Sequence, residues 1–363
     1  MCNIAIIDTI INEKHLHFTA CNKHYVNTNH NNSHNDSSNI NHGTMCAMIL
    51  ENCTYDYNLI NVCAFSEANT PKNNCEVKTL AKALEICGNL NIDIVNLSAA
   101  TSILSDSKYL YDLTYELSKN TIIVSALDNK RYLSIPASYK HIYGVQCDTK
   151  NILPLKEVAY CIDEPLNANL IANCNFEFLN QYGYSYSNSF AVPVAVGYIN
   201  NLLNSGVSKD QIPSKLQSLQ KYNVSDLYKS FLTKQKFEIP IVFLIDNSNI
   251  LCQKYMDIFY QQYEVQSTAI STIFDTEDIR VNKVMNMINI SEDILFMSYY
   301  YKTDLIFIIG NIDEFNDVNQ KIDIDIKIVR NNRHVMLSFE DKRLECMEQN
   351  VVKLIHDILT IQP

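Results

Sequence analysis

The sequence predicts an α/β protein whose sheets are mostly parallel, and three observations lead to this prediction. Short apolar runs of strand length recur along the 363 residues. Segments with helical spacing of apolar residues lie between them, which is the pattern of strand–helix–strand crossovers. After a polar stretch, the run IPIVFLID at 239–246 starts the same alternation again. We therefore expect a second, smaller α/β domain behind the first.

The first part begins with a buried strand at 3–7 (NIAII), which ends at Asp8. The polar stretch from 22 to 41 has no hydrophobic period and is expected to be a loop. His42 then opens an apolar helix, HGTMCAMIL. The same criteria predict strands at 57–65, 92–97, 121–126 and 142–146, helices at 77–87, 108–118 and 189–203, and a polar helix pair over 208–232.

The second part is predicted to follow a boundary in the polar run KQKFE, which gives domains 1–232 and 233–363. Its first strand is IPIVFLID. Later elements are expected to be helices near 250–264 and 281–288, a strand at 304–310, the strands IDIKIV and HVMLSF, and a last helix at 347–359.

Charge and composition exclude several classes of function. The formal net charge is −11, so a phosphate backbone is not attracted and no nucleic-acid partner is expected. The chain has no basic cluster for a membrane surface, no signal sequence at its start and no apolar run of about 18 residues. The twelve cysteines include no CxxC pair, which favours reduced thiols and a cytoplasmic location.

Three residues in separate segments fit nucleophilic catalysis by serine. Such catalysis needs a hydroxyl, a base within hydrogen-bond distance and an acid that orients the base. Asp8 stands at the carboxyl end of a strand, where catalytic groups gather in parallel sheets, and His42 and Ser189 each begin a helix. The chain order Asp, His, Ser is one of three known orders of this triad.

Over residues 3–205 the chain resembles the subtilisin-like serine peptidases, the subtilases. The segments that carry the resemblance are IAIIDT, HGTMCAMIL, NIDIVNLSAA, IIVSALDN with SIPASYKHIYGV, and SNSFAVPVAVG. The resemblance implies a three-layer domain with a mostly parallel sheet and a triad of Asp8, His42 and Ser189. It also implies an endopeptidase that acts on a peptide or protein substrate and requires no metal or organic cofactor.

The resemblance assigns two further groups. Ser98, Ala99 and Ala100 would lie alongside the substrate. The side-chain amide of Asn129 and the backbone N–H of Ser189 would hold the oxyanion; a strict count from the preceding strand selects Asp128 instead, whose carboxylate would repel an oxyanion.

The sequence departs from the family at several glycines. Ile10, Ala100, Asp128 and Ser187 stand where the family motifs have glycine. These losses motivate an alternative, a catalytically impaired peptide-binding protein that assists peptide maturation. A third interpretation is a hydrolase of non-peptide esters or amides.

The position of Asp8 leaves no room ahead of it for a folding propeptide, so the resemblance implies an intracellular subtilase. Such enzymes often trim one particular peptide, for example the leader of a ribosomally made, modified peptide.

Three other features receive an ordinary structural interpretation. The histidines at 15, 17, 24, 30 and 34 lack the thiol or carboxylate spacing of a zinc site and are expected to be solvated. The segment IPIVFLIDNSNILCQKYM has the layout of a phosphate-binding loop but no glycine, so this domain is expected to bind a peptide or partner. The aromatic residues Phe296 and Tyr299 to Tyr301 are expected to belong to the core rather than to a recognition surface.

Overall fold

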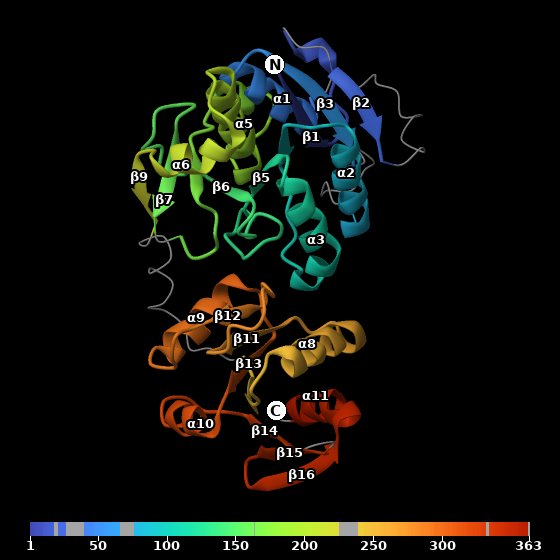
Figure 1. The fold of residues 1–363 in the computed structure, drawn as a ribbon, viewed down its shortest axis with the longest axis vertical. Helices are drawn as coiled ribbons and strands as arrows, with labels where there is room; N and C mark the ends of the chain where they lie inside the picture. Colours follow the sequence, from blue (N-terminus) through green and yellow to red (C-terminus); the bar gives the residue numbers. More distant parts are fainter. Residues whose placement is uncertain are drawn as a thin grey trace. The chain divides into compact units, whose positions relative to one another are not determined.

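A computed structural model describes residues 1–17, 21–26, 40–65, 76–162, 164–224, 239–331 and 334–361. The chain divides into two compact units (Figure 1). The first comprises Met1–Ser102 and Asp106–Leu227, and the second comprises Ile103–Ser105 and Tyr228–Pro363. The predicted boundary near 232–238 lies outside the described residues.

The first unit is built on one large sheet. Neighbouring strands are parallel except β7 and β8, which are antiparallel. The order of the described strands across the sheet is β2 (Cys21–Tyr25), β3 (Tyr57–Cys63), β1 (Cys2–Asp8), β4 (Ile94–Leu97), β5 (Ile122–Ala126), β6 (Tyr143–Cys147), β8 (Leu170–Ala172), β7 (Val158–Ile162) and β9 (Lys221–Asn223).

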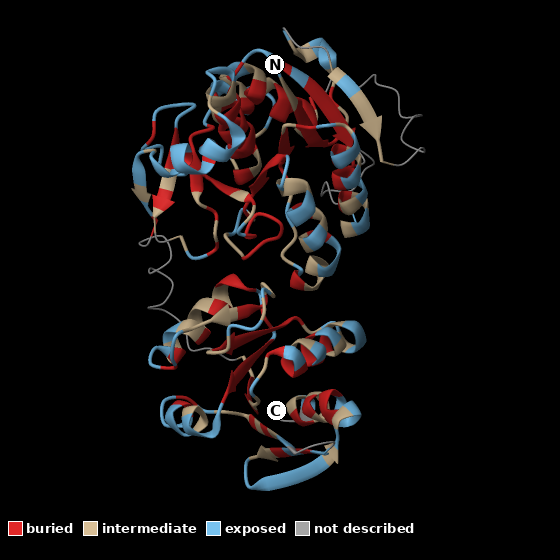
Figure 2. Ribbon diagram, viewed as in Figure 1, coloured by how far each residue is buried: buried red, intermediate tan, exposed pale blue. Residues whose placement is uncertain are grey.

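Helices cover both faces of this sheet, which confirms the predicted three-layer, mostly parallel α/β fold. The two central helices α1 (His42–Cys53) and α5 (Asn188–Asn204) pack against each other, as do α2 (Val77–Asn89) and α3 (Ser107–Ser118) (Figure 1). Central strands are buried on both faces, which explains their unbroken apolar runs (Figure 2). The short helices are α4 (Glu177–Gln181) and α6 (Ile212–Gln217), with 3-10 turns at Glu13–His15, Leu104–Asp106 and Lys209–Gln211.

The second unit has its own sheet and core. Its strand order is β12 (Val281–Lys283), β11 (Ser267–Ser271), β13 (Leu305–Gly310), β10 (Ile241–Ile245), β14 (Ile326–Asn331), β15 (His334–Phe339) and β16 (Lys342–Met347). The strands from β12 to β14 are parallel, and β14 to β16 form an antiparallel meander. Helices α8 (Ile250–Tyr263) and α11 (Val351–Ile361) lie on one side of this sheet, and α9 (Ile290–Tyr300) and α10 (Ile312–Asn319) lie on the other (Figure 1).

Some predicted elements were wrong. Residues 22–25 belong to β2 rather than to a loop, because β3 offers a parallel edge with which they pair. The helix expected near 281–288 is instead the edge strand β12, which pairs with β11, and the helix begins only at Ile290. In the polar segment after 208, only α6 is an α-helix among the described residues, and β9 follows it.

Candidate active site

Asp8 and His42 form the centre of the candidate site. Asp8 is the last residue of β1 and is 3% exposed, while His42 is the first residue of α1. The His42 Nδ1 atom lies 2.8 Å from Asp8 Oδ2 and 3.0 Å from Oδ1. The carboxylate therefore accepts the Nδ1 proton and fixes the ring, which leaves Nε2 as the basic atom.

The chain around Asp8 holds this pair in place. Asn41 caps α1 by accepting the Thr44 N–H at 2.9 Å, and its amide donates to the Ile10 carbonyl. The Gly43 N–H donates to Thr9 Oγ1 at 2.9 Å. A Cβ on Gly43 would lie 2.5 Å from the Thr9 carbonyl oxygen, so only glycine permits this approach of α1 to β1.

Ser189 lies at the start of α5, next to the residue that packs on His42. It is the second residue of the helix and is half-buried. The ring of the next residue, Phe190, stacks on the His42 imidazole with centroids 5.0 Å apart. The Ser98 hydroxyl donates to the Ser189 carbonyl at 2.9 Å. The hydrogen bond between the Ser189 hydroxyl and His42 is not formed in this structure; such contacts often tighten only when substrate is bound.

Asn129, rather than Asp128, has a donor available for an oxyanion. Asn129 is exposed in the turn after β5, and its Oδ1 accepts the Asn188 N–H at 2.9 Å, while its Nδ2 has no partner among the described residues. The Asp128 carboxylate instead accepts the Lys130 N–H at 2.8 Å. The Ser189 N–H, in the first turn of α5, likewise has no acceptor in the described part of the chain.

The predicted substrate-binding segment directly follows β4, and its first residue, Ser98, bonds the Ser189 carbonyl. Ser98 is buried, Ala99 is half-buried and Ala100 is exposed directly after β4. Thr101 exchanges two 2.9 Å backbone hydrogen bonds with Ile135. The segment is therefore held at both ends, by Ser98 on the Ser189 carbonyl and by Thr101 on Ile135.

Sequence reasoning missed Asn188, which joins three segments. Its Nδ2 donates to the Leu127 and Asp128 carbonyls at 3.0 Å each, and its Oδ1 accepts the Cys147 N–H at 2.8 Å. The signal was present in the motif SNS, where a polar residue directly precedes the candidate nucleophile.

Three buried thiols near the site were also missed as neighbours. Cys46 Sγ lies 3.4 Å from Ser98 Oγ, 3.9 Å from Asp8 Oδ2 and 3.8 Å from His42 Nδ1. The sulfurs of Cys147 and Cys174 are 3.4 Å apart, and Cys174 Sγ donates to the Ser187 carbonyl. All three are free cysteines.

Burial and charge set the protonation of the pair. Burial disfavours the charged imidazole of His42, but the adjacent Asp8 carboxylate outweighs it and raises the pKa of His42 well above its ordinary value. Burial also raises the pKa of the Cys46 thiol. Asp8, His42 and Cys46 form the one cluster of possible metal ligands among the described residues, and two of its members already bond each other.

The remaining histidines of the N-terminal segment form no such cluster in the described part. His24 lies in β2, and His15 ends a 3-10 turn. His30 and His34 lie outside the described residues. In the second unit, Tyr300 and Tyr301 are buried, as the core interpretation predicted, whereas Phe296 and Tyr299 are half-buried.

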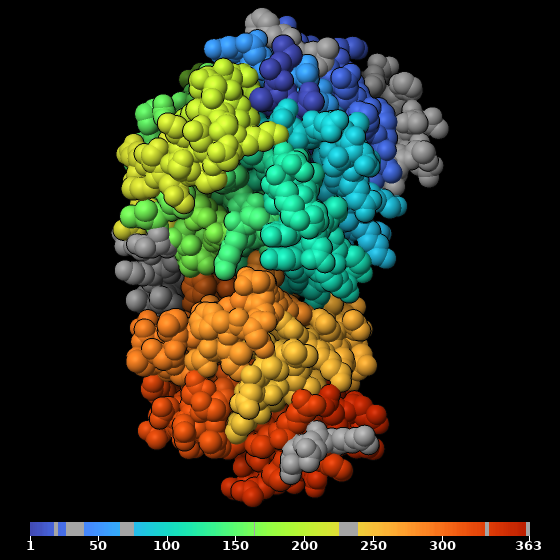
Figure 3. All heavy atoms as spheres, in the orientation of Figure 1, coloured from blue at the N-terminus to red at the C-terminus, as the bar shows by residue number. Residues whose placement is uncertain are grey.

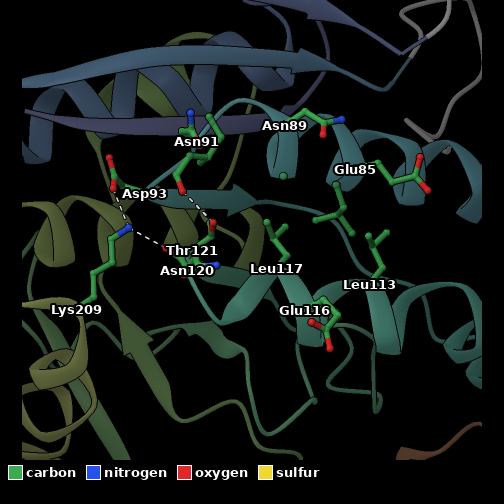
Figure 4. A pocket seen from close by; sticks show the side chains of 13 residues that line it. Glu85, Asn89, Asn91, Asp93, Leu113, Glu116, Leu117, Asn120, Thr121 and Lys209 are labelled. Carbon is green, nitrogen blue, oxygen red and sulfur yellow. Dashed lines mark hydrogen bonds and ion pairs between the residues drawn. The ribbon is translucent and has the colours of Figure 1, made fainter.

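A cavity of about 700 Å³ opens at the amino-terminal ends of the strands, opposite the candidate site (Figure 4). Asp93 and Thr121 precede β4 and β5, whereas Ser98 and Asn129 follow these strands. Lys209 bonds Asp93 and the Asn120 carbonyl at 2.8 Å each. This cavity is therefore separate from the candidate site, and its one lysine is already paired.

The fold is a mostly parallel α/β fold in which the Asp8–His42 pair joins the end of a central strand to the start of a central helix. The profile of the subtilase family (peptidase family S8) matches residues 2–224, and the chain belongs to this family.

Solved structures similar to the chain include three proteases. The prenylagaramide maturation protease PagA is 17% identical with a TM-score of 0.38 over 57% of this chain and 78% of its own. A cold-adapted subtilisin-like serine proteinase is 15% identical with a TM-score of 0.40 over 56% and 75%, and the patellamide maturation protease PatA is 17% identical with a TM-score of 0.37 over 66% and 87%. A search of curated proteins finds no significant match. Among the described helices, none has both the length and the apolar character needed to cross a bilayer.

Proposed function

We propose that the chain is a serine endopeptidase that processes a specific peptide in the cytoplasm. The observation that carries the proposal is the joint position of three groups: Asp8 bonds His42, and His42 stacks on the residue that follows Ser189. Family membership supports the same chemistry. The acidic balance of the chain argues against a nucleic-acid partner.

In the proposed reaction the Ser189 hydroxyl attacks the scissile carbonyl. His42 Nε2 takes the hydroxyl proton and passes it to the leaving amine, and Asp8 stabilises the imidazolium. Asn129 Nδ2 and the Ser189 N–H donate to the oxyanion. Water then cleaves the acyl-enzyme with His42 as the base, so the chain needs no metal or organic cofactor for either step.

Labelling with a fluorophosphonate tests this proposal, because the reagent phosphonylates a serine only when a neighbouring base activates it. Wild-type protein should be labelled at Ser189 by peptide mass spectrometry. Ser189→Ala and His42→Ala should abolish labelling, whereas Ser205→Ala, at the exposed end of the same helix, should not alter it. Absence of labelling in folded wild-type protein would contradict an activated serine.

A non-catalytic peptide-binding protein is the second candidate. The absence of a hydrogen bond between the Ser189 hydroxyl and His42 favours it, as does the exposed Ala100 side chain in the segment after β4, where the family motif has glycine. Peptide binding without labelling would select this candidate, and turnover of esters without turnover of peptides would select an esterase.

A further inference from the structure

The second unit has the topology at which α/β sheets bind ligands. From β10 the chain leaves through α8 toward β11, whereas from β13 it leaves through α10 toward β14. β10 and β13 are neighbours, and their connections run in opposite directions across the sheet. The helices α8 and α10 therefore lie on opposite sides of it (Figure 1). Ligands of open α/β sheets bind at the carboxyl ends of strands where the winding reverses in this way.

Exposed large apolar side chains follow the strands at this end of the sheet, which we call the carboxyl edge. The strand ends lie level, since Ser271 pairs with Lys283 and Ile309, and Ile245 pairs with Gly310. An exposed apolar residue follows each of these four strands within a few positions. They are Ile250 (71% exposed) after β10, Phe274 (57%) after β11, Met285 (85%) and Ile288 (68%) after β12, and Ile312 (49%) after β13.

The same edge is unsuited to a phosphate. At the start of α10, Asn311 accepts the Asp313 and Glu314 N–H groups at 2.9 Å, and the Glu314 carboxylate accepts the Asn311 N–H at 2.8 Å. This carboxylate covers Gly310, because a Cβ there would lie 2.5 Å from Glu314 Oε2. The backbone donors that would hold a phosphate are thus already occupied, two by the Asn311 amide oxygen and one by the Glu314 carboxylate.

Carboxylates around the apolar residues are not balanced by cations. Asp246, Asp275, Asp313 and Glu314 form no ion pair in the described part of the chain. Lys283 pairs with Glu277, and Lys321 donates to the carbonyls of Met287 and Ile288. Such a surface is complementary to a ligand that combines positive charge with apolar side chains.

We infer that this carboxyl edge binds a basic, apolar segment of the peptide substrate, at a distance in sequence from the scissile bond. The inference rests on the proposed peptidase function for its biological role, although the binding itself does not require catalysis. The second unit would raise the local concentration of the substrate without contributing a catalytic residue.

Binding is tested on the full-length Ser189→Ala protein, which cannot cleave the probe by the proposed mechanism. The probe is a short fluorescein-labelled peptide of alternating leucine and lysine, followed by fluorescence anisotropy. We expect Phe274→Ser with Met285→Ser to weaken binding by about tenfold. The matched control, Met347→Ser, changes an exposed methionine at the end of β16 and should leave affinity unchanged.

Two further comparisons sharpen the result. A peptide with glutamate in place of lysine should not bind, and Asp313→Asn should weaken binding of the lysine peptide and reduce its salt dependence. Equal peptide affinities of the double variant Phe274→Ser with Met285→Ser (the edge variant) and of the control Met347→Ser would overturn the inference. The inference would also be overturned if the protein without peptide were a dimer and the edge variant were a monomer. A second copy of the chain would then occupy this surface.

Catalysis separates this inference from the proposed function. In the wild-type protein, kcat/KM should be higher for a peptide that carries the leucine–lysine segment than for the same peptide without it, and the edge variant should remove the difference. If no peptide is cleaved while the Ser189→Ala protein binds normally, the proposed function fails and the binding site stands.

Discussion

Gly43 lies where the strand of Asp8 and the helix of His42 come closest. Gly43→Ala would place a Cβ 2.5 Å from the Thr9 carbonyl and 3.2 Å from Asp8 Cβ, so the Asp8–His42 pair must shift. We expect a loss of stability of about 1–3 kcal/mol and strongly reduced fluorophosphonate labelling. Gly88→Ala in α2 is the control, since its Cβ meets only Leu117 at 3.8 Å; it should be neutral or stabilising. Equal labelling of the two variants would refute the argument.

The pH dependence of the site follows from the raised pKa of His42. The base must be neutral, so the labelling rate should rise with pH through a midpoint above about 6.5, the ordinary imidazole value. Asp8→Asn removes the carboxylate but not the burial, so the midpoint of the labelling rate should fall.

The folding stability should change with pH in the opposite direction. The Asp8–His42 ion pair contributes fully at a pH below the ordinary pKa of histidine, and its contribution is lost as pH rises through the raised pKa of His42. Rates and urea unfolding measured across pH would check both.

Glu264 shows how this glycine-poor chain makes its turns. It ends α8 with a φ of 56°, a left-handed conformation that favours glycine. Glu264→Gly should therefore stabilise the second unit by about 1 kcal/mol. Glu292→Gly, inside α9, should destabilise it by a similar amount. Thermal melts of the two variants that shift in the same direction would contradict this account.

At the scale of elements, the start of α5 depends on Asn188. Asn188→Ala removes the side-chain partner of the Leu127 carbonyl and the Cys147 N–H, whereas the Asp128 carbonyl keeps the Arg131 N–H as a donor. Leu127 and Asp128 immediately precede Asn129 in the chain. Unsatisfied buried groups cost about 1–3 kcal/mol each, so unfolding in urea should shift clearly and labelling should slow. Asn204→Ala, at the exposed end of the same helix, should change neither.

The sequence predicted elements best where burial alone decides them. The central strands and the helices at 42 and 188 carry unbroken apolar runs, and their ends place Asp8, His42 and Ser189. Residues 22–25 and 281–283 were assigned wrongly because each forms an edge strand, which is defined by pairing with another strand rather than by its own apolar pattern. The contacts of Asn188 and of the buried thiols also depend on tertiary packing, which no local pattern encodes.

At the scale of the whole molecule, each unit has a core that its own strands and helices form. On the view of Figure 3, helices α2 and α3 and the segment after α5 cover the sheet of the first unit. Phe307, fully buried in β13, packs only among residues of the second unit in the described core. The two cores are therefore expected to unfold separately.

Phe307→Ala should destabilise the second unit by about 3–5 kcal/mol and lower only one of two urea transitions. Fluorophosphonate labelling at Ser189 reports on the first unit and should persist beyond that transition. A single transition that carries all signals together would show that the units unfold as one.

The sulfur atoms of Cys147 and Cys174 have a practical consequence for any experiment on this protein. Oxidation would draw them from 3.4 Å to about 2.05 Å and remove the S–H donor to the Ser187 carbonyl. Because Ser187 immediately precedes α5, a protein in which this pair had been oxidised would differ from the reduced protein at the start of the helix of Ser189. Storage with a reductant, and a mass measurement for the loss of two hydrogens, would keep the redox history of a sample from being mistaken for its catalytic competence.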